Sequence, residues 1–442
     1  MARDTASARW ARDELDFCAE WDVVSLSEVA DPERGITYGI VQPGPMTPGG
    51  VPIVRVNNVK GGRIETVDVH YVSHAIAAKY ERTRLRGGEV LLTVVGTVGE
   101  TAIVPPEMAG WNTARAVAVI PVKPEIGPEW VDLCLRSAPL QHLIDVWCTT
   151  TVQKTFNLKE VWELPIPLPP PKQRSAIARV LGGLDDKIEL NRRMNRTLED
   201  LARGLFRSWF VDFDPVIKNG SAKASAAPPG LFPKRLVDSP LGPIPEGWTI
   251  GSVADLARYV NGRNFTKNAT GAGRMVVRIA ELNSGPGGST VYNDVKAEPV
   301  NVVQPGDLLF AWSGSLDVYR WNRDEALVNQ HIFKVVCEAY PQWFVHFHLC
   351  EAMPFFQGIA ADKATTMGHI KREHLGQAEL ALPPEAVLRY ASAQIEPIYA
   401  RLLANERESI RLAATRDALL PQLLSGEVRL RGGAAVVEEA LA

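Results

Sequence analysis

The chain has 442 residues, 46% of them hydrophobic, so it is long and apolar enough to bury at least two ordinary cores. Its formal net charge of −3 excludes a strong global field that would attract nucleic acid, and its five cysteines, with no Cys-x-x-Cys pair, disfavour a disulfide framework or a zinc ribbon. Because no run approaches about 18 consecutive apolar residues, we expect a soluble protein of the reducing cytoplasm, neither exported nor membrane-spanning.

The chain carries an internal duplication. Residues 21–30 match residues 248–257 position by position, at an offset of 227 residues. Weaker matches follow along the chain: 54–59 with 277–282, 88–92 with 306–310, and 164–170 with 378–384. A repeat period near half the chain length indicates two copies of one structural unit. Each copy ends in a helix-forming stretch, so the order is globular domain, helix, globular domain, helix.

The boundaries follow from the repeat and from Pro-, Gly- and Ser-rich stretches. We expect an N-terminal segment (1–20), a globular domain (21–168), a helical spacer (169–212), a linker (213–245), a second globular domain (246–382), a second helical spacer (383–427) and a tail (428–442). The predicted fold is α+β: two similar globular α/β domains joined by two long helices that form an antiparallel coiled coil, with approximate twofold symmetry.

The coiled coil is predicted from a strict alternation of four- and three-residue steps. The seam of the first helix includes Leu181, Leu184, Ile188, Asn191 and Leu198. Carrying the seam forward by 214 residues gives a second one with Ile395, Ile398, Leu402, Asn405 and Leu412. A polar residue at a seam position fixes the register, so we expect Asn191 to pair with Asn405. Packing of the two helices on separate neighbours is the alternative.

Several segments resemble a known family. They are Leu164–Pro171 with Gln173 and Arg174, Leu184–Asn191, Phe206–Pro215 and Pro243–Trp248, within a doubled unit that spans essentially the whole chain. Together they closely resemble the specificity subunits of type I restriction-modification systems. The chain departs from the family pattern at Glu385–Val387, where the glutamine-rich helix opening of the first copy is missing.

The resemblance implies two target-recognition domains, each reading one half of a bipartite, asymmetric site in double-stranded DNA. It also implies helices that set the spacer and dock two methyltransferase (M) subunits, with restriction and translocation (R) subunits joining through the complex. The chain itself would need no cofactor, since S-adenosylmethionine, ATP and Mg²⁺ would be used by those partners.

The sequence holds no recognisable catalytic motif. No glycine is followed directly by lysine, which excludes a Walker phosphate loop, and no Asn-Pro-Pro-aromatic tetrad of the amino-methyltransferases occurs. His369 and His374 do not have the spacing of helical zinc ligands. Asp185 and Asp186 fall on the predicted coiled coil, where a solvated charged face is the usual meaning. We therefore expect a non-catalytic chain without a metal site.

Candidate DNA-contacting residues are polar or basic and fall in loops of both copies, where side chains could reach bases or phosphates. In the first domain they are Arg55, Asn57, Asn58, Arg82, Arg84, Arg86, Thr97, Arg115 and Lys154. In the second they are Arg263, Lys267, Arg278, Ser313, Arg320, Asn329, Gln330, His369 and Lys371. Each could instead be a solvated surface group or part of a turn, and the sequence does not separate base contacts from phosphate contacts.

The function that we predict is a DNA-reading scaffold without catalysis of its own. A two-headed protein–protein adaptor that does not bind DNA is the alternative, which the near-neutral charge permits. A fused enzyme is disfavoured because its motifs are absent.

Overall fold

The computed structural model describes residues 15–150, 153–218, 228, 230–362 and 368–430. The chain forms two compact units: unit 1 comprises residues 1–186 and 412–442, and unit 2 comprises residues 187–411. Each unit contains one copy of the repeat together with a section of both long helices. The expected mixed α/β fold with long connecting helices is confirmed. Among the described helices, none combines the length and the apolar character that a bilayer crossing requires.

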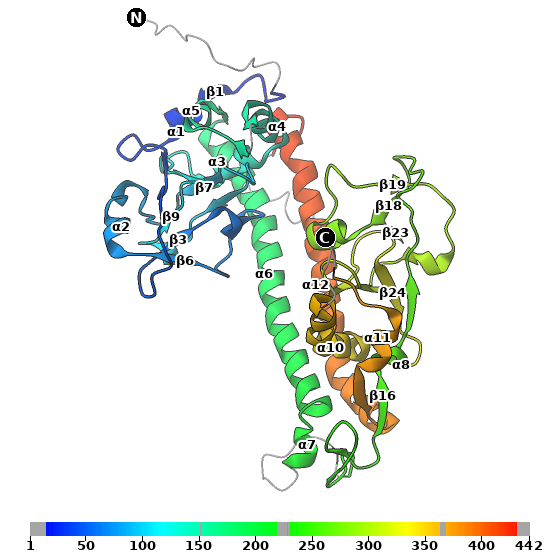
Figure 1. Ribbon diagram of the computed structural model, residues 1–442. Helices are drawn as coiled ribbons and strands as arrows, with labels where there is room; N and C mark the ends of the chain where they lie inside the picture. The colour runs from blue at the N-terminus through cyan, green and yellow to red at the C-terminus, as the bar shows by residue number, and fades with distance from the viewer. Residues whose placement is uncertain (1–14, 151–152, 219–227, 229, 363–367, 431–442) are drawn as a thin grey trace, which may run out of the picture. The chain divides into compact units, whose positions relative to one another are not determined.

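Unit 1 is built on two small sheets, with strand orders β2-β10-β7-β8 and β6-β3-β9. Its strands are β1 (Asp22–Ser25), β2 (Thr37–Tyr38), β3 (Val51–Val54), β4 (Val59–Lys60), β5 (Arg63–Ile64), β6 (His70–Val72), β7 (Val90–Thr93), β8 (Thr101–Ile103), β9 (Asn112–Thr113), β10 (Val117–Ile120), β11 (Thr149–Thr150), β12 (Lys154–Thr155) and β13 (Pro165–Leu168). Its short helices are α1 (Leu26–Val29), α2 (His74–Ala78), α3 (Pro128–Arg136), α4 (Ala138–Trp147) and α5 (Leu158–Glu163). The helices α3 and α4 pack beside the first turns of α6 (Pro171–Phe210), as Figure 1 shows.

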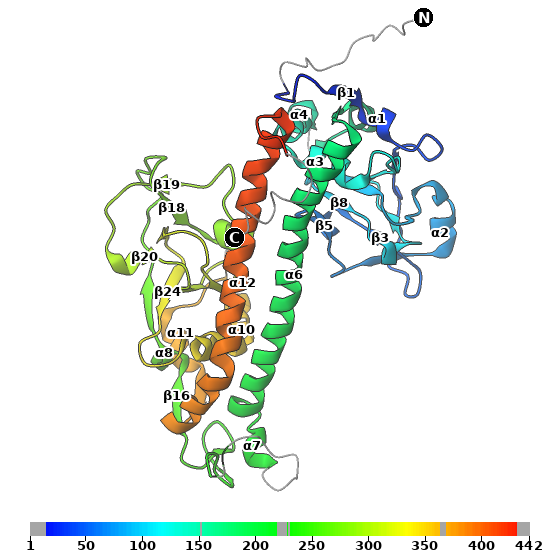
Figure 2. The same cartoon turned by 180° about the vertical axis from the view of Figure 1, so that it is seen from behind.

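Unit 2 repeats this plan with strand orders β17-β24-β21-β22 and β19-β18-β23-β20. Its strands are β14 (Leu236–Val237), β15 (Ile244–Pro245), β16 (Thr249–Ser252), β17 (Arg258–Asn261), β18 (Arg274–Val277), β19 (Tyr292–Asn293), β20 (Val302–Val303), β21 (Leu308–Ala311), β22 (Asp317–Arg320), β23 (Ala326–Val328), β24 (Ile332–Val336) and β25 (Glu379–Leu382). Its helices are α7 (Asp214–Ile217), α8 (Val253–Leu256), α9 (Ile279–Ser284), α10 (Gln342–Asp362), α11 (Arg372–Gln377) and α12 (Glu385–Ser425), the last of which continues into unit 1. In unit 2, α10 lies against α12, as can also be followed from behind in Figure 2.

The strongest sequence repeat corresponds to the closure of each copy. The first strand pairs antiparallel with the last, β1 with β13 and β16 with β25. At the start of α1 the Glu28 carboxylate accepts from the N–H (3.1 Å) and the hydroxyl (3.0 Å) of Ser25, and at the start of α8 the Asp255 carboxylate accepts from the N–H (2.8 Å) and the hydroxyl (2.7 Å) of Ser252. A carboxylate three residues after the N-cap serine thus satisfies the N–H of that serine, which has no partner within the helix. Both ends of each copy are therefore fixed, and a long helix begins directly after the closing strand.

Within each unit the two long helices run antiparallel. In unit 1, Asp185 of α6 pairs with Arg416 of α12 at 2.5 Å, and Leu181 packs in one buried cluster with Leu420 and Leu423. In unit 2, Ile188 and Leu402 are buried, and Leu198 and Ile398 pack against the same core as Ile395. Leu184 and Leu412 are half-buried.

The predicted pairing of Asn191 with Asn405 is wrong by one step. The Asn191 amide donates to Glu408 (2.8 Å) and Ser409 (3.4 Å), whereas the Asn405 amide donates to Asn195 (2.8 Å). In the 214-residue repeat, residue 191 corresponds to residue 405 and residue 195 to residue 409. The contact between residues 191 and 409 is therefore equivalent to the contact between residues 405 and 195. The local symmetry axis of this helix pair thus passes between two polar layers instead of through one asparagine pair.

Candidate nucleic-acid interface

Four segments of unit 1, residues 39–41, 94–98, 113–116 and 154–156, are joined by backbone hydrogen bonds into what we call the loop frame. The bonds run from Ile40 N to Thr113 O (2.7 Å), Arg115 N to Ile40 O (2.8 Å), Val94 N to Ala116 O (2.8 Å), Gly96 N to Lys154 O (2.9 Å) and Phe156 N to Val94 O (2.8 Å). The side chains of Ile40, Val94, Thr113 and Phe156 are buried and anchor these segments, whereas Thr97 and Arg115 are exposed.

Unit 2 builds the same loop frame bond for bond from residues 262–264, 312–316, 328–331 and 368–370. The bonds run from Arg263 N to Val328 O (3.1 Å), Gln330 N to Arg263 O (3.1 Å), Trp312 N to His331 O (3.1 Å), Gly314 N to Gly368 O (3.0 Å) and Ile370 N to Trp312 O (3.0 Å). This match assigns each frame residue a counterpart in the other copy.

Glycines are required at two points of each frame. A Cβ on Gly39 would lie 2.1 Å from the carbonyl oxygen of Thr113, and one on its counterpart Gly262 would lie 2.0 Å from that of Asn329. Gly96 and Gly314 adopt positive φ angles of 80° and 71°, which side chains disfavour. The two strands of each frame can approach this closely only because glycine has no side chain.

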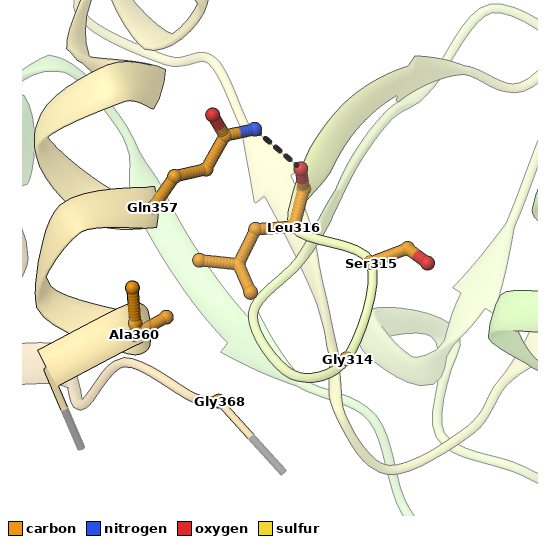
Figure 3. Close-up of a pocket in the computed structure, with 7 residues that line it drawn as sticks. Gly314, Ser315, Leu316, Gln357, Ala360 and Gly368 are labelled. Carbon is orange, nitrogen blue, oxygen red and sulfur yellow. Dashed lines mark hydrogen bonds between the residues drawn. The ribbon is translucent and has the colours of Figure 1, made fainter. Parts of the chain in front are cut away.

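A glutamine supports the glycine-containing loop in each copy. The amide of Gln141, on α4, donates to the carbonyl oxygens of Gly99 (3.0 Å) and Leu135 (2.7 Å). The amide of Gln357, on α10, donates to that of Leu316 at 3.5 Å (Figure 3). A hollow of about 490 Å³ lies beside this loop in unit 2. The loop is therefore held to its helix by one hydrogen-bonding side chain, and in unit 2 the hollow is lined by residues of both the loop and the helix.

The polar side chains that the frames expose differ between the copies. In unit 1 they are Thr97 and Arg115, with Lys154 half-buried and paired to Asp145. In unit 2 they are Arg263, Asn264, Ser315, Gln330, His331 and His369, of which Arg263 forms an exposed ion pair with Glu298 (3.1 Å). One backbone design thus presents two different sets of donors and acceptors.

Three predicted contact residues instead form a repeated structural motif. The amide side chain of Asn58 is buried, accepts a hydrogen bond from Arg55 N (2.9 Å) and donates to Glu65 O (3.0 Å). In unit 2, Glu281 accepts from Arg278 N (3.0 Å) and binds its guanidinium at 2.5 Å. These hydrogen bonds stabilise a turn in each copy. Asn58 is buried there and is not placed to read DNA, whereas a DNA contact by the partly exposed Arg278 stays a prediction. Arg55 is likewise held, by Asp68 at 2.9 Å.

Arg320 lies inside unit 2 and holds the two long helices. Its guanidinium contacts Glu199 of α6 at 2.8 Å and Glu406 of α12 at 2.7 Å. Burial alone would raise the pKa of Glu199, but the hydrogen bond with His346 and the charge of Arg320 outweigh it and lower that pKa to about 2. Arg320 is therefore an internal ion-pairing residue and is not available to DNA.

Two further predicted residues are buried for local reasons. Ser313 is 7% exposed and forms an isolated β-bridge with His369. Asn329 is also 7% exposed and accepts a hydrogen bond from Phe265 N at 3.2 Å. Sequence reasoning chose Ser313 where the exposed hydroxyl is Ser315, the counterpart of Thr97. Comparing the loops position by position from their glycines would have found it.

The remaining predicted residues are exposed but lie outside the bonded frame segments. They are Asn57, Arg82, Arg84, Arg86, Lys267 and Lys371. Arg84 pairs with Glu81 at 2.9 Å, and Lys371 pairs with Glu373 at 3.4 Å. A DNA contact by any of them stays a prediction. No cluster of three or more potential metal ligands occurs among the residues that the structure describes.

The chain is similar to several known proteins. Residues 19–200 match the family model described as type I restriction modification DNA specificity domain. The type I restriction enzyme MjaIX specificity subunit of Methanocaldococcus jannaschii is 23% identical over 456 residues, covering 93% of this chain and 94% of that protein. The EcoBI specificity subunit of Escherichia coli is 30% identical over 161 residues, covering 36% of this chain and 34% of that protein.

A solved structure, the S subunit of the type I restriction-modification system from M. genitalium, matches with a TM-score of 0.51 and 12% identity. The match covers 92% of this chain and 96% of that chain, and it shows a shared fold.

Proposed function

Because this chain belongs to the family of type I restriction-modification specificity subunits, which are non-catalytic, we propose that each of its two units reads one half of a bipartite, asymmetric DNA site. The target-recognition domains would comprise residues 21–168 and 246–382, the segments that the closing strand pairs β1–β13 and β16–β25 bracket. The proposed ligand is genomic double-stranded DNA, and the proposed location is the cytoplasm.

The observation that carries this proposal is the loop frame, built twice with the same backbone hydrogen bonds and with different exposed side chains. Sequence-specific DNA binding needs donors and acceptors whose positions are fixed by a rigid backbone. Two identical frames with identical side chains would favour a symmetric site. Frames that present Arg115 in one copy and Gln330 in the other favour unlike half-sites, which together form an asymmetric sequence.

We further propose that α6 and α12 set the distance between the half-sites and dock two methyltransferase subunits. Helices of 40 and 41 residues would each span roughly 60 Å at about 1.5 Å per residue. This length supports a spacer role, because about 18 base pairs at 3.4 Å each cover the same distance. The polar seam layers around Asn191 and Asn405 support it further, since they oppose sliding of one helix along the other.

Catalysis would come from the partners. The methyltransferase subunits would bind S-adenosylmethionine, and the restriction subunits would use ATP and Mg²⁺. This chain would supply the DNA sequence to which those activities are directed.

The proposal is tested by selection from a random duplex library with the purified complex of this chain and its methyltransferase partner. Enriched sequences should contain two fixed blocks separated by a spacer of constant length and random sequence. If no duplex binds at low salt, where nonspecific phosphate contacts are strongest, the two-headed protein adaptor is the better account.

A further inference from the structure

Arg115 and Gln330 occupy the same position of the two loop frames. The N–H of each donates to the first frame segment, to Ile40 O at 2.8 Å and to Arg263 O at 3.1 Å. The N–H of the preceding residue donates in each case to a central strand residue, Val54 O at 2.9 Å or Val277 O at 3.1 Å. The carbonyl of the following residue accepts from the glycine-containing loop in both units. The backbone at this position is thus fixed on three sides.

The side chains at this position are exposed in both units. No hydrogen bond or ion pair joins either of them to another described residue, whereas Arg55, Arg278 and Arg320 are each held by a carboxylate. The fixed backbone sets the position from which each side chain extends. Because neither side chain has an internal partner, neither has to break a hydrogen bond before it contacts a base.

The hydrogen-bond donors and acceptors of the two side chains indicate which base each could recognise. The guanidinium offers two parallel N–H donors, which match the N7 and O6 acceptors of guanine in the major groove. The glutamine amide offers one donor and one acceptor, which match the N7 and N6–H₂ of adenine.

We propose, resting on the proposed function, that Arg115 and Gln330 are equivalent specificity-determining residues. Arg115 reads a guanine in the half-site of unit 1, and Gln330 reads an adenine in the half-site of unit 2.

The difference between Arg115 and Gln330 also argues against a phosphate contact at this position. Phosphate contacts gain most of their affinity from charge and counterion release, so a position that serves them would keep a cation in both copies. Glutamine keeps a donor and a similar reach but loses the charge. The difference between Arg115 and Gln330 therefore keeps the donor and the reach that a base contact needs, but not the positive charge that a phosphate contact needs.

The test exchanges the two side chains, one variant at a time, in the full chain bound to its methyltransferase partner. Sequences are selected from a random duplex library, and duplexes that differ at one base pair then compete for binding. Arg115→Gln should change one position of one half-site from guanine to adenine, and Gln330→Arg should make the opposite change in the other half-site. Each preference should shift by roughly 5- to 150-fold, the range that one bidentate base contact provides.

Two control variants make the same substitutions at exposed positions outside the frames. Arg179→Gln removes an exposed arginine from α6 in unit 1, and Gln377→Arg adds one at the end of α11 in unit 2; neither should alter a half-site. Gln330→Glu keeps the shape of the side chain but loses the donor, so it should abolish the adenine preference even if arginine does not fit.

An unchanged half-site in both exchange variants overturns this inference. So does a uniform loss of affinity for all sequences with a smaller salt dependence, because that result marks a phosphate contact. If the wild-type complex selects no bipartite sequence, the proposed function fails as well. A bipartite wild-type site that neither exchange alters refutes the base assignment alone.

Discussion

Replacing Arg320 by methionine removes a guanidinium that bridges two carboxylates, Glu199 at 2.8 Å and Glu406 at 2.7 Å. Breaking a buried ion pair from one side costs about 3 to 5 kcal/mol, because the remaining charge is left without a partner. Here the carboxylates keep 31% and 26% of their side-chain surface accessible. We therefore expect a loss near the low end, about 3 kcal/mol, which lowers the melting temperature of a body of this size by about 6 to 12 °C.

Calorimetry of the full chain measures the melting temperature, and hydrogen exchange shows whether the loss falls in unit 2. Arg263→Met is the matched control: it removes an ion pair that is 61% and 60% exposed, so it should cost less than about 1 kcal/mol. Adding Glu406→Gln to Arg320→Met should recover part of the stability by removing an unpaired charge. If Arg320→Met melts like the wild-type chain and relaxes one base of the DNA site, Arg320 is a DNA contact and the structural assignment is wrong.

Three more outcomes are expected. One heptad inserted into each long helix, at the boundary between the units, adds about 10 Å and should lengthen the spacer by about 3 base pairs while both half-sites stay the same; mapping of methylated sites would reveal any altered half-site, which would contradict the spacer role. Gly39→Ala forces a Cβ to within 2.1 Å of a backbone oxygen, so binding competition should show loss of one half-site only; retention of both half-sites would mean that the frame of unit 1 does not read DNA. Burial lowers the pKa of His348 to about 3, so below its ordinary pKa of 6.5 the unfolded chain takes up a proton that the folded chain does not. This proton should therefore contribute a fall of up to about 1.4 kcal/mol per pH unit in the free energy of unfolding between pH 6.5 and 3. Denaturant titration should find a slope that is shallower by this contribution in His348→Phe.

The duplication and the long helices were predictable because they depend on local chemistry. Ser25 and Ser252 recur because each caps a helix, and Trp21 and Trp248 recur because each is buried beside that cap. The seam residues follow the heptad spacing whatever their partners are.

The helix register was not predictable from the repeat. An antiparallel pair with internal symmetry requires only that the contacts occur in symmetry-related sets. Asn191 with Asn405 satisfies this condition, and so does Asn191 with Ser409 together with Asn195 with Asn405. The choice between them depends on how the side chains of both helices pack against the domains, which spacing does not reveal.

The candidate site was predicted only in part, because residues that recur in both copies can have a structural role as well as a functional one. Arg278 matches Arg55 in the sequence, and the structure shows that both support a turn. Arg320 has no polar counterpart: its position on β22 corresponds to Ile103 on β8, since the two pair with equivalent strand residues, Leu308 and Val90. The backbone hydrogen bonds of the frames join residues 19 to 75 positions apart, and sequence spacing does not reveal such contacts.

The central claim is that two unlike reading units on one chain define one asymmetric, interrupted DNA site. Single-molecule sequencing of a methylation-free host that carries this chain and its methyltransferase partner tests the claim most directly, because it reports both half-sites and their spacing. The account predicts modification at a sequence with two different fixed blocks and a spacer of constant length. Modification at one continuous or palindromic sequence would contradict it.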